Sequence, residues 1–275
     1  MRLKKTEIEE KLNILKTWVN GFDKEDKENF INQLSELEFT SPNKKDVFNA
    51  FDGLTPQNTK VLIIGQDPYT DKKYKNKATG YAFLMNKTVT ENDSLYYILK
   101  AINKNNTIIP KKITEENYTD LIKWVYNNKV LMLNTSLTYK DNSKNMHCNT
   151  WKSFIEIVIY NLLINAEQSL SIFLWGKDAQ NNFLKILNVL KEKEEISFNG
   201  AEYCKNNKNK FKLFKTVKRN KNHIIAKMRN KEIKVYMYSH PSKLNEIKNK
   251  PLPFDCTKHF QDEMWKNLLK IYNNA

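Results

Sequence analysis

The chain has 275 residues, 40% of them hydrophobic and 12% aromatic, which is enough to bury a large core. Its net charge of +15 favours polyanionic partners, nucleic acid first and anionic membrane surfaces second, although a solvated basic surface is the simpler alternative. Three widely spaced cysteines without a C-x-x-C pair argue against a disulfide framework or a zinc site. They fit a reducing, intracellular compartment, and we expect neither a signal peptide nor a membrane span.

The predicted elements alternate between helix and strand. Apolar residues recur every three to four positions at 7–20 and 26–38, which predicts two helices. Four apolar, β-rich runs follow, at 61–64, 130–133, 170–175 and 233–238. Helical patterns accompany them at about 94–103, 117–128, 151–166, 178–191 and 258–272. This alternation predicts a parallel sheet flanked by helices.

One segment interrupts the alternation. Residues 191–235 hold 14 Lys and Arg against 5 Asp and Glu, so they carry +9 of the total charge. We interpret about 191–232 as a Lys- and Asn-rich insertion in a single domain spanning 1–275. It is expected to form a small hairpin or to remain mobile.

Each predicted strand ends in a polar motif. The four are Gly65-Gln66-Asp67-Pro68-Tyr69, Leu133-Asn134-Thr135-Ser136-Leu137-Thr138, Trp175-Gly176-Lys177-Asp178-Ala179-Gln180 and Ser239-His240-Pro241-Ser242. The carboxyl ends of parallel strands meet at one crevice, so an Asp, an Asn and a His are expected to lie close together there. The aromatic segment Gly80-Tyr81-Ala82-Phe83 is near the first motif in sequence.

These motifs, in this order, resemble those of family-1 uracil-DNA glycosylases. The shared patterns are Gly-Gln-Asp-Pro-Tyr, Gly-x-Ala-Phe, Leu-Asn-Thr-x-Leu-Thr, Leu-Trp-Gly-x-x-Ala-Gln and His-Pro-Ser. The similarity covers about 42–190 and 233–272. It implies an α/β fold, a three-layer αβα sandwich with a central four-stranded parallel sheet.

The resemblance also implies roles for residues around a flipped uracil. Asp67 would activate the attacking water, and His240 would donate a hydrogen bond to uracil O2, where negative charge develops. Asn134 would read the Watson–Crick edge of the base, and Phe83 would stack on its face. Structural alternatives remain open, because an Asp before Pro often caps a turn and a strand-end Asn can satisfy backbone groups.

Further residues would exclude thymine or bind DNA. Tyr69 would block the thymine methyl group and the Gln66 backbone would contact the base edge. Leu244 would enter the duplex as an apolar wedge. The phosphate-contacting positions are Ser94, Gly176, Lys177, Ser242 and Lys243.

The chain departs from the family pattern at several positions. Thr70 stands where most members carry His, and Lys243 where the wedge loop usually has Pro. The segment Glu91-Asn92-Asp93 replaces a Pro-rich loop, which weakens the assignment of Ser94. His147 lies one residue out of register with a family His, and we assign it no role.

The leading hypothesis is therefore a monofunctional uracil-DNA glycosylase that leaves an abasic site and initiates base excision repair. The resemblance implies no metal or cofactor, single- and double-stranded DNA containing uracil as substrate, and a monomer. It leaves room for a protein inhibitor or replication partner, and for an intracellular location in cytoplasm, nucleus or viral factory. The alternatives are a DNA- or partner-binding protein with weak or no catalysis, and an enzyme acting on 5-substituted uracils.

Overall fold

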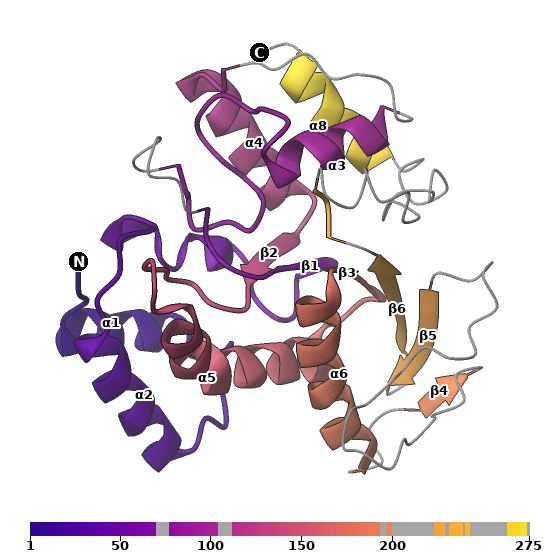
Figure 1. Ribbon diagram of the computed structural model, residues 1–275. Helices are drawn as coiled ribbons and strands as arrows, with labels where there is room; N and C mark the ends of the chain where they lie inside the picture. Colours follow the sequence, from indigo (N-terminus) through magenta and orange to yellow (C-terminus); the bar gives the residue numbers. More distant parts are fainter. Residues whose placement is uncertain are drawn as a thin grey trace.

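The computed structural model describes residues 1–69, 77–103, 112–192, 197–199, 223–228, 231–238, 240–242 and 263–273. Thr70, Lys243 and Leu244 lie outside this part of the chain, as does most of the predicted insertion. The fold is a sheet covered by helices on both faces (Figure 1).

Four parallel strands form the centre of the sheet, as predicted. They are β1 (Val61–Gly65), β2 (Val130–Asn134), β3 (Leu170–Trp175) and β6 (Lys231–Tyr238). β1 pairs with β2 on one side and with β3 on the other, and β6 pairs with β3. The connection after β1 runs over one face of the sheet and the connection after its neighbour β2 runs over the other, which creates a crevice at the carboxyl ends of the strands.

The sheet is wider than the four strands expected. β5 (His223–Met228) pairs antiparallel with β6, and β4 (Ser197–Asn199) pairs antiparallel with β5. The full order is β2-β1-β3-β6-β5-β4. Both added strands come from the segment interpreted as an insertion, so its ends belong to the sheet.

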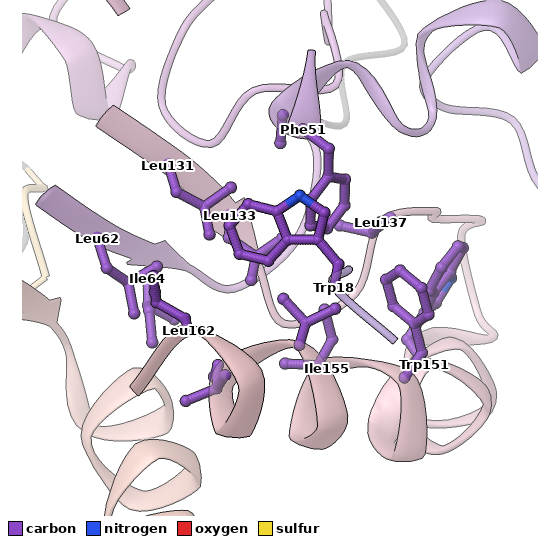
Figure 2. Packing of buried hydrophobic residues seen from close by; sticks show 14 of the residues in the cluster. Trp18, Phe51, Leu62, Ile64, Leu131, Leu133, Leu137, Trp151, Ile155 and Leu162 are labelled. Atoms are coloured by element: carbon purple, nitrogen blue, oxygen red, sulfur yellow. The ribbon is translucent and has the colours of Figure 1, made fainter. Parts of the chain in front are cut away.

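Two hydrophobic cores lie on opposite faces of the sheet. Side chains alternate along a strand, so Leu62 and Ile64 of β1 face one core while Val61 and Ile63 face the other. The first core contains residues of α1 (Lys5–Ile14), α2 (Lys24–Glu36), α5 (Lys144–Asn165) and α6 (Lys177–Glu192). Figure 2 shows Leu62, Ile64 and the β2 leucines packed against α5 and Trp18.

The second core contains residues of α3 (Ser94–Ile102), α4 (Glu115–Asn127) and α8 (Glu263–Asn273). These three helices lie together on the other side of the sheet (Figure 1). Two short 3-10 helices, η1 (Lys44–Asp46) and η2 (Asn49–Phe51), precede β1. The three-layer αβα architecture predicted from the sequence is therefore confirmed.

Two helix boundaries differ clearly from the prediction. The first helix ends at Ile14 rather than near 20. The pattern predicted a longer helix because Leu15, Trp18 and Val19 keep a helix-like spacing, but they bury their side chains from tight turns. Helix α5 begins at Lys144 rather than 151. The sequence pattern missed its first turns because they carry polar residues without an apolar period.

Candidate active site

A cavity of about 340 Å³ opens at the carboxyl ends of β1, β2 and β6. Seven of the twelve predicted site residues line it: Gln66, Asp67, Tyr69, Phe83, Ser94, Asn134 and His240. Pro68, Asn92 and Tyr139 complete the lining. Residues almost 180 positions apart in sequence therefore share one small, largely polar chamber.

The loop after β1 is held by the loop after β2. The backbone N–H groups of Thr135 and Ser136 donate to the carbonyls of Gly65 and Gln66, at 3.0 and 3.1 Å. The Thr135 hydroxyl adds a bond of 3.0 Å to the Gln66 carbonyl. These bonds continue the strand pairing beyond the sheet, so the two motifs are fixed relative to each other.

Asp67 follows directly and lines the cavity with a partly exposed side chain. The thiol of Cys148, from the first turns of α5, donates to Asp67 Oδ1 at 3.8 Å. Cys148 also lines a second cavity of about 230 Å³ between α5 and α6. The carboxylate is therefore contacted from behind by a helix and open to the main cavity in front.

Asn134 ends β2 and is only 4% exposed. Its Cα is paired in register with Gly65 at the end of β1. A Cβ atom on residue 65 would lie 2.3 Å from Asn134 Oδ1 and 3.0 Å from Ala82 Cβ. Glycine is required at this position because the buried amide occupies the space that any side chain would need.

Phe83 presents its ring from a strained backbone. Its φ of 64° lies in the left-handed region, which is costly for a bulky residue. The preceding Ala82 N–H donates to the Met132 carbonyl at 2.9 Å, which attaches the segment to β2. The ring contacts Trp175 edge-on, with centroids 5.1 Å apart, and lies 6.1 Å from the His240 ring. The strain is thus maintained by neighbours on β2 and β3.

Tyr69 is fixed at its hydroxyl. The hydroxyl donates to the Phe83 carbonyl at 3.1 Å and accepts from the Leu95 N–H at 3.3 Å. Burial raises the pKa of Tyr69 far above its ordinary value of 10, and the nearby charge of Asp93 adds to the effect. The phenol therefore stays neutral and keeps the proton that it donates to Phe83.

His240 lies against the turn that follows β3. Gly176 has a φ of 102°, and a Cβ there would be 3.2 Å from His240 Cβ. Gly176 accepts from the Gln180 N–H at 3.1 Å and so caps the start of α6. Lys177 is exposed and Ser242 is half-buried, and neither contributes to the cavity lining.

Comparison with known proteins identifies the family. The model of the uracil DNA glycosylase superfamily matches residues 52–269. The chain belongs to this superfamily. The uracil-DNA glycosylase of Amoebophilus asiaticus is 32% identical over 177 residues, which cover 62% of this chain and 76% of that protein. The enzyme of that name from Francisella tularensis subsp. holarctica is 36% identical over 140 residues, covering 50% and 60%.

Solved structures of the superfamily share the fold of this glycosylase. The crystal structure of mimivirus uracil-DNA glycosylase has a TM-score of 0.53 at 19% identity, covering 86% of this chain and 69% of that one. A variant of the mimivirus protein in complex with UGI has a TM-score of 0.52 at 20% identity, covering 89% and 71%. The resemblance inferred from five short motifs is confirmed.

The motifs did not point to every residue lining the cavity of this glycosylase. Tyr139 directly follows the Leu-Asn-Thr-x-Leu-Thr motif, and its backbone N–H donates to the Ser41 carbonyl at 2.8 Å. The Ser41 hydroxyl in turn donates to the Tyr69 carbonyl at 2.9 Å. This pairing with a distant loop helps to place Tyr139 in the cavity lining, and no local pattern signals it.

His147 lies behind the glycosylase cavity and does not line it. It is fully buried, with Nδ1 2.9 Å from the Thr138 hydroxyl. That hydroxyl accepts from the Trp151 indole N–H at 2.7 Å, so its own proton is directed at His147 Nδ1. Burial lowers the pKa of His147, which favours the neutral ring.

The described residues offer neither a metal site nor a membrane span. Among them, no group of three or more His, Cys, Asp and Glu side chains is arranged to hold a metal ion. None of the helices in the described ranges is both long and apolar enough to cross a bilayer.

Proposed function

We propose that this glycosylase excises uracil from DNA with the side chains that line the cavity, each acting at a different point on the nucleotide. The protein is a uracil-DNA glycosylase, a hydrolase of the N-glycosyl bond that acts in base excision repair. The observation that carries the division of roles is the meeting of Asp67, Asn134 and His240 in one chamber. A protein that only binds DNA has no need of all three.

Asp67 serves the sugar side of the reaction. Breaking the bond builds positive charge on the deoxyribose and negative charge on the departing base. A carboxylate stabilises the cationic sugar and accepts a proton from the attacking water. Asp67 faces the cavity while Cys148 contacts Oδ1, so the carboxylate is held in place where it can orient water.

His240 serves the base side. A ring N–H directed at uracil O2 stabilises the negative charge as it forms, and a neutral imidazole is sufficient for this. Its ring lies beside that of Phe83, and its backbone packs on Gly176. The base and the imidazole can therefore occupy neighbouring positions along the same aromatic wall.

Asn134 selects the base. Its amide offers a donor for O4 and an acceptor for N3–H, which is the pattern of uracil and the reverse of cytosine. Burial against Gly65 limits rotation of the amide, and a fixed amide discriminates more strongly than a mobile one. Phe83 supplies the stacking surface, and Tyr69 closes the cavity against a 5-methyl group.

The remaining predicted positions contact DNA around the cavity. Ser94 lies on the cavity rim at the start of α3, while Lys177 is exposed at the start of α6. The start of α6 presents backbone N–H groups of the kind that bind phosphate, whereas Ser94 offers its hydroxyl, because the Leu95 N–H is already bonded to Tyr69. Ser242, Lys243 and Leu244 follow His240, where a wedge loop would compensate for the loss of base stacking.

The proposal extends to substrates and partners. Uracil in single- or double-stranded DNA is the expected substrate, since a flipped base is read the same way in both. The mimivirus neighbour in complex with UGI makes a protein inhibitor a reasonable partner to test. A monomeric, intracellular enzyme stays a prediction.

Release of uracil from oligonucleotides, in buffer containing EDTA, tests the function. Asp67→Asn should lower the single-turnover rate by about 10²- to 10⁴-fold while leaving DNA affinity nearly unchanged. Asp120→Asn makes the same chemical change on an exposed carboxylate of α4 and serves as the matched control. Equal losses of rate and affinity in Asp67→Asn would contradict a catalytic carboxylate.

A further inference from the structure

A buried ion pair lies next to the cavity and belongs to none of the roles described above. Lys77 Nζ is 2.5 Å from Asp93 Oδ1, and the two side chains are only 5% and 3% exposed. Removing two charges from water is costly, so such a pair persists only where its geometry is well satisfied. Neither residue lines the cavity, so the pair acts on the site through other groups.

Asp93 is held on its second oxygen as well. Its Oδ2 accepts from the Thr90 N–H at 2.8 Å and from the Thr90 hydroxyl at 2.9 Å. The carboxylate therefore closes the turn that leads into α3 and gives that turn a defined shape. Asn92 and Ser94, on either side of Asp93, are the residues of this turn that line the cavity.

The same unit holds Tyr69 at two points. Lys77 Nζ lies 5.3 Å from the centre of the Tyr69 ring, within the range of a cation–π contact. Leu95, two residues after Asp93, donates its N–H to the Tyr69 hydroxyl. The ion pair is therefore connected to both contacts that hold Tyr69. Lys77 lies over the ring, and Asp93 closes the turn that carries the Leu95 N–H bonded to the hydroxyl.

We infer that the Lys77–Asp93 pair is a positioning device that fixes the Tyr69 ring and so sets how strictly the enzyme rejects 5-substituted uracils. The inference rests on the proposed function, in which Tyr69 faces C5 of the base. Rejection by steric exclusion requires a wall that cannot retreat. The ammonium group behind the ring, anchored by Asp93, removes the space into which the ring could move.

Oligonucleotides carrying uracil or 5-bromouracil at one position test the inference, because bromine is close to a methyl group in size. Lys77→Met keeps an unbranched, flexible side chain that is one atom shorter and removes the charge. It should raise the kcat/KM for 5-bromouracil relative to uracil by about tenfold or more, in line with the 10- to 200-fold discrimination that one methyl-sized group supplies. Asp93→Asn keeps one oxygen to accept from Thr90 but replaces the oxygen that pairs with Lys77 by an NH2 group, and should shift the preference in the same direction.

A purely structural role makes a different prediction. Leu34→Ala opens a hole in the core on the far side of the sheet and serves as a control for lost stability. It should lower the melting temperature without changing the preference between the two bases. If the Lys77 and Asp93 variants behave like this control, or if neither folds, the pair supports the fold and the inference is wrong.

The result for the wild type distinguishes failure of the proposed function from failure of the inference about Lys77 and Asp93. A wild-type protein that releases no uracil overturns the proposed function, and the inference falls with it. A wild-type protein that releases uracil, with an unchanged preference in soluble Lys77→Met and Asp93→Asn, overturns the inference alone.

Discussion

Replacing Gly65 by alanine should damage base recognition while leaving the protein folded. The new Cβ would lie 2.3 Å from Asn134 Oδ1, whereas ordinary contact begins at 3.4 Å. The amide oxygen must therefore move by about 1 Å, and a displacement of that size near reacting groups can lower rates by about 100-fold. Gly65 has no positive φ, so alanine adds no backbone strain to this steric effect.

The buried amide and Ala82 Cβ, which would lie only 3.0 Å away, must both give way, so the substitution costs some stability. Loss of the glycine also reduces the freedom of the unfolded chain, which contributes about 0.4–1 kcal/mol in favour of folding. The expected signature is thus a modestly lower melting temperature and a kcat/KM for uracil release about 100-fold lower. Gly21→Ala makes the same substitution where no atom lies within 4 Å, and its φ of 74° should cost stability without affecting uracil release.

A double-variant comparison decides whether the effect passes through Asn134. If it does, Gly65→Ala combined with Asn134→Ala should be no slower than Asn134→Ala alone, because the displaced group is already gone. Additive losses would mean that the new methyl group disturbs another part of the site. Full activity in Gly65→Ala would refute the placement of the Asn134 amide at the base edge.

Three other predictions concern pH, charge and the thiol behind Asp67. Burial lowers the pKa of His147 below the unfolded value of about 6.5, so its stabilising contribution is present above that value and is lost as pH falls further. The melting temperature of His147→Gln should therefore fall less steeply than that of wild type below about pH 6.5, and equal slopes would contradict this. Residues 200–222 carry eight Lys and Arg against one Glu. If they contact phosphates, replacing them by a short linker should make DNA affinity depend less steeply on salt concentration. An unchanged dependence on salt would dismiss that role. Alkylation of wild type with N-ethylmaleimide should reduce uracil release more than tenfold, because Cys148 lines the second cavity and contacts Asp67. Uracil release by Cys148→Ser should resist the reagent. Equal sensitivity of the two proteins would point to another cysteine.

The boundaries of the 200–222 replacement follow from the sheet topology. Deleting the whole predicted insertion, 191–232, would remove β4, β5, the end of α6 and the first residues of β6. Asn199 ends β4 and His223 begins β5, opposite Tyr236 near the carboxyl end of β6. The flanking residues Asn199 and His223 thus lie toward the end of the sheet that carries the site, and replacing 200–222 leaves the described strands intact.

The parts of the fold that are predictable are those in which local chemistry and the tertiary environment agree. A strand buried on both faces must be apolar throughout, so the apolar runs at 61–64, 130–133 and 170–175 match the strands almost to the residue. Their polar ends have to meet because parallel strands finish at one edge. The strand pattern alone therefore places Asp67 and Asn134 in one crevice.

The parts that could not be predicted depend on contacts between distant loops. The short strands β4 and β5 lie in a Lys- and Asn-rich segment without a sustained apolar pattern, and they form by pairing with the edge of an existing sheet. Tyr139 enters the site through a backbone pairing with Ser41, almost 100 residues earlier. The Tyr139 pairing has no local signature because it depends on a loop far away in sequence, whereas β5 is a short apolar run, His223–Met228, that pairs with the strand directly after it.

Contacts in the folded state take the place of a Pro-rich loop before Ser94. Prolines stiffen a loop by restricting the unfolded chain, whereas Glu91-Asn92-Asp93 leaves that chain free. Here the restriction comes from the folded state, in which Asp93 bonds to Thr90 and to Lys77. A loop held in this way depends on a charge supplied from another segment. Substitution of Lys77 should therefore affect the Ser94 side of the cavity as well as Tyr69, and weaker binding of DNA by Lys77→Met at equal protein stability would be the sign of it.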